Sequence, residues 1–241
     1  MKYFLFFILS VIFTFNLFAN DVDLAIELRD KGEVKKAMEL FSKVCSKGEP
    51  RACYNLAVIY YEGKLEKQDY LKAKKLYEKA CTSNHAFACY NLGIMYDNAK
   101  GILKDSLKAK DLFEKSCTLG DSFGCYNVGM FYYDGEYITQ DYKKAKNFFE
   151  MACNDKDYSS CHNLGVMYHN AQGVEQDYSK AKKLYTKACK QDNPYSCTNL
   201  GIIYAKALDG KKDLRKAKQL FLKACNLGSQ TGCKNYKTLK Y

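Results

Sequence analysis

The sequence predicts an all-α fold, a right-handed αα superhelix (solenoid) built from 36-residue repeats. The first observation is that the twelve cysteines form six C-x7-C pairs, whose gaps alternate between 8 and 28 residues. A fixed period of this size is the signature of a stacked repeat array. The second observation is that each period contains two stretches with apolar residues at helical spacing. Such helix pairs bury their apolar faces only by stacking on their neighbours, so a solenoid is expected.

The first nineteen residues predict a cleaved secretory signal peptide. Lys2 precedes an apolar run from Tyr3 to Phe13, and the segment ends at Ala19, after which cleavage is expected. This run is short for a membrane span, although an uncleaved N-terminal anchor is the alternative. We therefore expect a secreted or periplasmic protein, in a compartment where paired cysteines persist as disulfides.

The rest of the chain, residues 20–241, is predicted to be a single repeat domain, because no stretch resembles a linker. It begins with a partial repeat over 21–50 and ends with a C-terminal cap over 231–241. The five full repeats between them are 51–86, 87–122, 123–158, 159–194 and 195–230.

The first helix of each repeat is expected to begin near the second cysteine of a pair. Cys53, Leu56, Ala57 and Tyr60 fall at i, i+3, i+4 and i+7, which is one apolar helix face. Later repeats place glycine at the position of Ala57, which lets the partner helix approach closely. These glycines are Gly93, Gly129, Gly165 and Gly201. The two prolines, Pro50 and Pro194, suit the start of this helix.

The second helix is expected to begin at an aspartate that caps free backbone N–H groups. The aspartates are Asp69, Asp105, Asp141, Asp177 and Asp213. Ala73, Leu76, Tyr77 and Ala80 would form its buried face, with lysines on the opposite side. The net charge of +11, or +10 after removal of Lys2, is therefore interpreted as solvated helix faces, and no nucleic-acid partner is expected.

The cysteines are predicted to be disulfides, one at each helix junction. The first cysteine of a pair ends one helix and the second opens the next, so a short turn brings the thiols together. The expected pairs are Cys45–Cys53, Cys81–Cys89, Cys117–Cys125, Cys153–Cys161, Cys189–Cys197 and Cys225–Cys233. Zinc, the alternative, needs four clustered ligands at tighter spacing, and none of the three histidines recurs with the cysteines. No metal or cofactor is expected.

The motifs Asn-Leu-Gly-x-x-Tyr and Asp-Tyr-x-Lys-Ala-x-x-Leu-Tyr-x-Lys-Ala-Cys resemble Sel1-like repeats, which are related to tetratricopeptide repeats. With one C-x7-C pair per repeat and a signal sequence, residues 21–241 resemble the Helicobacter cysteine-rich proteins. Their loops usually hold two glycines. Here Gly63 and Gly135 keep the first, Gly101 and Gly173 keep the second, and 195–230 has neither, so loop shape is expected to vary. The resemblance implies two functions, because members are described as penicillin-binding proteins with slow β-lactamase activity and as secreted interaction proteins.

The residues themselves assign no catalytic site. The S-x-x-K stretch from Ser179 to Lys182 is a repeat lysine that happens to follow a serine, and no S-D-N or K-T-G accompanies it. His162 and His169 share a helix face at i, i+7, and we expect them to form a surface stripe and not a metal site.

The candidate ligand-binding residues lie on the first helices, which line the concave groove of such solenoids. Tyrosines suit recognition, although they equally suit packing between helices; the candidates are Tyr54, Tyr90 and Tyr126. An asparagine follows the second cysteine by two residues in every repeat, as Asn55, Asn91, Asn127, Asn163, Asn199 and Asn235. These amides either hold a peptide backbone, as asparagines do in related tetratricopeptide grooves, or tie down the preceding turn.

We therefore predict a secreted, disulfide-stapled protein that binds a peptide, a cell-wall fragment or another protein in this groove. Slow hydrolysis of penicillin-type β-lactams is the alternative that the resemblance implies. No stable membrane insertion is expected once the signal peptide is removed.

Overall fold

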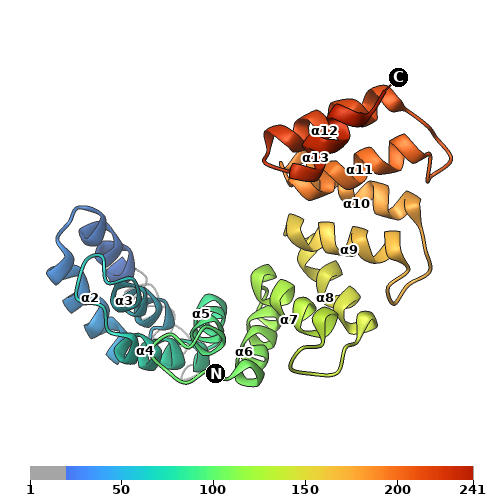
Figure 1. The fold of residues 1–241 in the computed structure, drawn as a ribbon. Helices are drawn as coiled ribbons and strands as arrows, with labels where there is room; N and C mark the ends of the chain where they lie inside the picture. The colour runs from blue at the N-terminus through green and yellow to red at the C-terminus, as the bar shows by residue number, and fades with distance from the viewer. Residues whose placement is uncertain (1–19, 241) are drawn as a thin grey trace, which may run out of the picture. The chain divides into compact units, whose positions relative to one another are not determined.

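The computed structural model describes residues 20–240 and contains only helices and connecting loops over that range (Figure 1). Residues 1–19 lie outside the described residues, so the signal peptide and its cleavage stay predictions. The fold divides into two compact units, one ending at Asp121 and the other beginning at Ser122. In each unit the helices pack as consecutive pairs, so the predicted all-α repeat architecture is confirmed.

The first unit begins with a helix over residues 20–30. Its other helices are α2 (Val34–Ser46), α3 (Pro50–Glu62), α4 (Tyr70–Thr82), α5 (Ala86–Asp97) and α6 (Ser106–Thr118). The closest pairs are α3 with α4 and α5 with α6, which are the first and second helices of two successive repeats.

The second unit repeats this arrangement and ends in a short cap helix (Figure 1). Its helices are α7 (Ser122–Asp134), α8 (Tyr142–Asn154), α9 (Tyr158–Asn170), α10 (Tyr178–Lys190), α11 (Pro194–Lys206), α12 (Leu214–Asn226) and α13 (Gln230–Thr238). The pairs are α7 with α8, α9 with α10 and α11 with α12, and α13 packs on α12.

The predicted helix starts are confirmed in detail. The Asp69 carboxylate accepts from the Lys72 backbone N–H at 2.9 Å, and the four equivalent aspartates cap their helices in the same way. Pro50 and Pro194 occupy the first positions of α3 and α11, where no backbone N–H is needed.

Packing within the four later pairs depends on the repeated glycine, whereas α3 has Ala57 at this position. A Cβ atom added to Gly165 would lie 2.7 Å from the Tyr185 ring, and one added to Gly93 would lie 2.7 Å from the Phe113 ring. The aromatic side chain of the second helix therefore lies directly against the first-helix backbone, as predicted. On the second helix, Ala73, Tyr77 and Ala80 are buried as expected, whereas Leu76 at the edge of that face is only partly buried.

The loop after each first helix is more regular than the glycine pattern suggested. One loop position is left-handed in all five full repeats although its residue type varies, with φ of 67° at Gly63, 53° at Ala99, 69° at Gly135, 57° at Ala171 and 53° at Ala207. The same conformation therefore recurs where alanine replaces glycine, although a left-handed alanine costs about 1–2 kcal/mol. The expectation of variable loop shape was wrong at this position. Two residues later it is confirmed, because Gly101 and Gly173 are left-handed with φ of 70° and 68°, whereas Leu65, Tyr137 and Asp209 are not.

Candidate functional site

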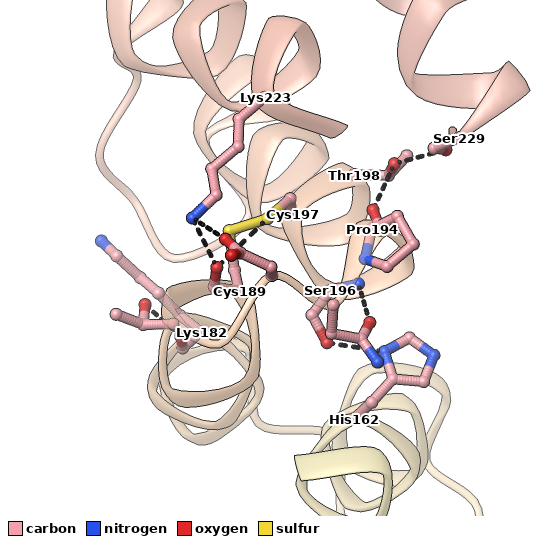
Figure 2. Close-up of a disulfide and its surroundings, with 12 residues drawn as sticks. His162, Lys182, Cys189, Pro194, Ser196, Cys197, Thr198, Lys223 and Ser229 are labelled. Carbon is pink, nitrogen blue, oxygen red and sulfur yellow. Dashed lines mark hydrogen bonds and ion pairs between the residues drawn. A yellow bond between two sulfur atoms is a disulfide. The ribbon is translucent and has the colours of Figure 1, made fainter. Parts of the chain in front are cut away.

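The cysteines join successive helices at the ends of the pairs, as predicted. In Figure 2 the Cys189–Cys197 disulfide connects the end of α10 to the start of α11, with Cα atoms 4.7 Å apart. The same bond is present at Cys45–Cys53, Cys81–Cys89, Cys153–Cys161 and Cys225–Cys233, and Cys117 and Cys125 are also disulfide-bonded. No free cysteine is present among residues 20–240, which rules out thiolate zinc ligands and a cysteine nucleophile there.

A recurring lysine reinforces four of the six junctions, and sequence reasoning missed its role; Met151 replaces it at the Cys117–Cys125 junction. The Lys223 ammonium of α12 donates to the Cys189 carbonyl oxygen at 2.9 Å, as Figure 2 shows. Other lysines of the same repeat position make the equivalent bond to the preceding repeat, namely Lys79 to Cys45, Lys115 to Cys81 and Lys187 to Cys153. Each lysine neutralises the negative end of a second helix, where backbone carbonyls lack helical partners. The composition suggested that the lysines only form solvated helix faces, but these lysines are bonded within the fold.

Tyr54, a predicted ligand contact, lies partly buried between helices. Its ring stacks on His85 at 4.6 Å between centroids and contacts Tyr77 and Phe87 at 6.0 and 6.4 Å. Burial raises the pKa of the Tyr54 hydroxyl.

The other two predicted tyrosines are placed in the same way. Tyr126 of the second unit contacts Phe149 at 6.2 Å between ring centroids. Tyr90 of the first unit is likewise half-buried and contacts Phe113 at 5.6 Å. These rings thus pack between helices while presenting one edge at the surface.

The histidines were expected on a surface stripe, and both are partly exposed, with other rings packed against them. His162 Nδ1 lies 2.8 Å from the Ser196 hydroxyl of the next repeat (Figure 2), and its ring contacts Tyr185 and Tyr195. His169 packs edge-on against Tyr178 at 5.2 Å. Burial lowers the pKa of His162 to about 4, so its imidazole is neutral near pH 7. Both positions share a face with tyrosines of other repeats, and neighbouring rings cover that face only in part.

These contacts also decide the chemistry open to the serines. Ser196 is fully buried beneath His162, so its hydroxyl is inaccessible as a nucleophile. Ser179 of the S-x-x-K stretch is exposed, but the Lys182 ammonium is bonded to the Asp209 carboxylate and lies over the Tyr204 ring. The S-x-x-K match therefore gains no support from the structure. In the described range, no group of three or more His, Cys, Asp or Glu is placed to hold a metal ion.

The asparagines lie on the first helices, and they have intramolecular partners. Asn55 donates to the Arg51 carbonyl at 2.8 Å, and Asn127 donates to the Phe123 carbonyl at 2.8 Å. Others contact the neighbouring helix or repeat, as Asn91 to the Tyr77 hydroxyl, Asn163 to the Met130 sulfur and Asn199 to Tyr185. Each of these amides thus has a structural role, at the first helix itself or at its neighbour.

One further set on this face escaped the sequence reasoning. Three aromatic side chains at one repeat position, near the start of the first helix, are exposed by half or more: Phe87 (51%), Phe123 (53%) and Tyr195 (65%). Tyr195 lies against His162, and Phe87 lies against Tyr54, so each of these two extends the aromatic surface of the preceding repeat. The sequence signal that could have identified them is that all three occupy the same position in their repeats.

No helix among residues 20–240 is both long and apolar enough to cross a bilayer. The disulfides are typical of an oxidising compartment outside the cytoplasm.

Comparison with known proteins agrees with the fold. A family model for the Sel1 repeat matches residues 50–85, 86–121, 122–157, 159–193 and 194–229. A search of curated proteins found no match.

Several solved structures are similar to this chain. The crystal structure of c5321, a protective antigen of uropathogenic Escherichia coli strains, is 23% identical over 91% of this chain with a TM-score of 0.86. This chain spans 48% of that protein's length. A Sel1 repeat protein from Oxalobacter formigenes is 25% identical over 89% of this chain and 87% of its own, with a TM-score of 0.78. Helicobacter pylori cysteine rich protein B is 30% identical over 56% of this chain and 97% of its own, with a TM-score of 0.44. Because the Sel1 model matches most of its length, this chain belongs to the Sel1 repeat family.

Proposed function

We propose that this protein is an extracytoplasmic scaffold that binds an extended, apolar peptide segment of a protein partner along the first helices of its second unit. The observation that carries the proposal is the pair of exposed aromatic side chains at one repeat position of that unit, Phe123 and Tyr195. A phenylalanine or tyrosine exposed to this extent leaves half or more of its area available to a partner. Rigid aromatic area with few rotatable bonds is what protein-binding surfaces use.

The asparagines support a peptide ligand even though they have intramolecular partners. A side-chain amide carries two N–H donors and one acceptor oxygen. Asn127 uses one N–H on the Phe123 carbonyl, which leaves the second N–H and the oxygen for a ligand. The intramolecular bond fixes the amide orientation, so little side-chain entropy is lost when a peptide backbone binds.

The size of the pockets beside the first helices also favours a peptide over a small molecule. In the second unit, a pocket of about 190 Å³ is lined by Ile202, Ala205, Lys206 and Asn235. In the first unit, a pocket of about 200 Å³ includes Val58, which occupies the repeat position of Ile202. Small-molecule sites usually exceed about 300 Å³, so each pocket suits one side chain; Arg29, Glu62 and Lys64 make the pocket of the first unit partly charged.

The test uses the oxidised protein and a peptide library displayed on phage. Enriched peptides are synthesised with a fluorescent label, and their Kd is measured by anisotropy. Phe123→Ala and Tyr195→Ala should each raise the Kd about tenfold, the usual effect of removing a central aromatic contact. Tyr137→Ala, which removes an aromatic side chain that is 42% exposed on a loop, is the matched control and should leave the Kd unchanged. No enriched peptide, or equal effects in all three variants, would refute the proposal.

The hydrolysis of β-lactams implied by the resemblance is checked on the same preparation with a chromogenic β-lactam. Turnover that survives Ser179→Ala would exclude the S-x-x-K serine as its nucleophile. Absence of turnover would leave peptide binding as the function.

A further inference from the structure

The largest of the pockets described lies away from the first-helix face, between the second helices α8 and α10. Its volume is about 320 Å³, within the range of small-molecule sites. Its apolar lining includes Leu164, Tyr168 and Leu184, and three lysines surround it: Lys180, Lys183 and Lys187.

The apolar floor of this pocket is held by a disulfide. Leu164 is 4% exposed, and Leu184 packs against the buried cluster that contains Cys153 and Cys161. The Cys153–Cys161 bond joins α8 to α9 at this point, so the floor is attached to a covalent junction. A floor of this kind is formed before any ligand arrives, which lowers the entropy cost of binding.

The charges around the floor are mainly positive. Lys187 is positioned by its bond to the Cys153 carbonyl, at 2.7 Å, and Lys180 lies over the Tyr168 ring at 5.0 Å. Lys180 also lies 3.5 Å from Asp177, a weak surface ion pair. Lys183 is exposed and has no acidic partner among the described residues.

One acidic side chain, Glu150, also lines the pocket. Its carboxylate lies 2.8 Å from the Lys146 ammonium on the same helix, which neutralises it. The pocket therefore combines an apolar floor with at least one lysine whose charge is unpaired.

The equivalent positions of the first unit, on α6, keep the leucine but have a different charge. Leu112 occupies the repeat position of Leu184, whereas Asp111 occupies that of Lys183 and pairs with Lys110 at 3.0 Å. On α12 the position of Lys183 holds an uncharged residue, Gln219. The repeat architecture therefore does not require a lysine here, and Lys183 gives the α8–α10 groove a positive charge that its equivalents on α6 and α12 lack.

We propose that the α8–α10 pocket binds a small amphipathic organic anion. Its carboxylate or sulfonate group would lie between Lys183 and Lys187, and its single ring or short apolar chain would rest on Leu164 and Leu184. Lysines beside an apolar floor attract an anionic group more strongly than they would in bulk water, because the local dielectric is lower there. Burial of the ligand's apolar part on Leu164 and Leu184 adds binding free energy that other lysines on the surface cannot supply.

The experiment titrates the oxidised protein with toluene-4-sulfonate, an aromatic sulfonate with one ring, well below the melting temperature and follows amide NMR shifts. We expect saturable one-to-one binding that weakens as salt rises, because exposed charges are screened. Amide NMR shifts should map to α8 and α10.

Two variants take their residues from equivalent positions of this same chain. Lys183→Asp installs the residue found at Asp111 and should weaken binding by about fivefold or more, through loss and reversal of one charge. Leu184→Phe installs the residue found at Phe148, and its larger side chain should weaken binding similarly by filling the floor. Thermal melts verify that each variant is folded, and Lys183→Gln, the residue of α12, provides a milder change of charge.

The matched control is Lys75→Asp. It makes the same charge change at the same repeat position, but on α4 and outside the pocket, so it should have no effect. Binding that is unaffected by both pocket variants, equally weakened by Lys75→Asp, or mapped elsewhere would overturn the proposal.

Discussion

The disulfide near the C-terminal end of the chain allows a direct test of how much each disulfide stabilises the helix that it joins. Cys225 and Cys233 join α12 to α13, a helix of nine residues in which Gly232 is the one buried residue. Isolated helices shorter than about 12–15 residues are marginal in water. We therefore predict that α13 depends on the disulfide and that Cys225→Ala with Cys233→Ala lets α13 open on its own.

The magnitude follows from the loop that the bond closes. The two cysteines are separated by 8 residues. In the chain-entropy model a loop of this size contributes about 2.5 kcal/mol. That free energy corresponds to a change of about 70-fold in the opening equilibrium of α13.

The assay is native-state amide hydrogen exchange, which reports local opening helix by helix. Amides of α13 should exchange about 70-fold faster in the double variant, while those of α9 and α10 keep their protection. The matched control is Cys153→Ala with Cys161→Ala, which opens a loop of the same length. That bond is buried among Ala188 and Leu184, so its loss should lower the melting temperature of the unit as a whole. Unchanged protection of α13, or equal loss in every helix of the variant, would refute this reasoning.

Two further predictions concern contacts between repeats. Burial lowers the pKa of His162 to about 4, below its ordinary value near 6.5, so the unfolded chain binds the proton more readily. The free energy of unfolding should therefore fall by about 2 kcal/mol between pH 7 and pH 5, measured by urea denaturation. The fall should be smaller in His162→Tyr, and an equal pH dependence in both proteins would contradict this prediction. Lys223→Met installs the residue found at the equivalent Met151 and removes the hydrogen bond to Cys189. The free energy of unfolding, measured by urea denaturation, should fall by about 1 kcal/mol. An unchanged midpoint would show that the hydrogen bond contributes nothing to stability.

The sequence by itself determined the repeat, the helix boundaries and the disulfides. Asp69 caps a helix and Cys189 pairs with Cys197 through interactions that span a few residues, so the local pattern was enough to predict them. Gly165 also followed from the sequence, because the packing within a helix pair recurs in every repeat.

The tertiary structure decided everything that depends on which side chains meet across neighbouring repeats. His162 lies beside Ser196, and Lys187 reaches Cys153, in both cases across 34 residues. The exposed set that includes Tyr195 and the cationic pocket at Lys183 likewise emerged only once the helices were stacked. The physical reason is that a period fixes where a side chain stands in its own repeat, whereas its burial, charge environment and pKa depend on the residues that the adjacent repeats place against it.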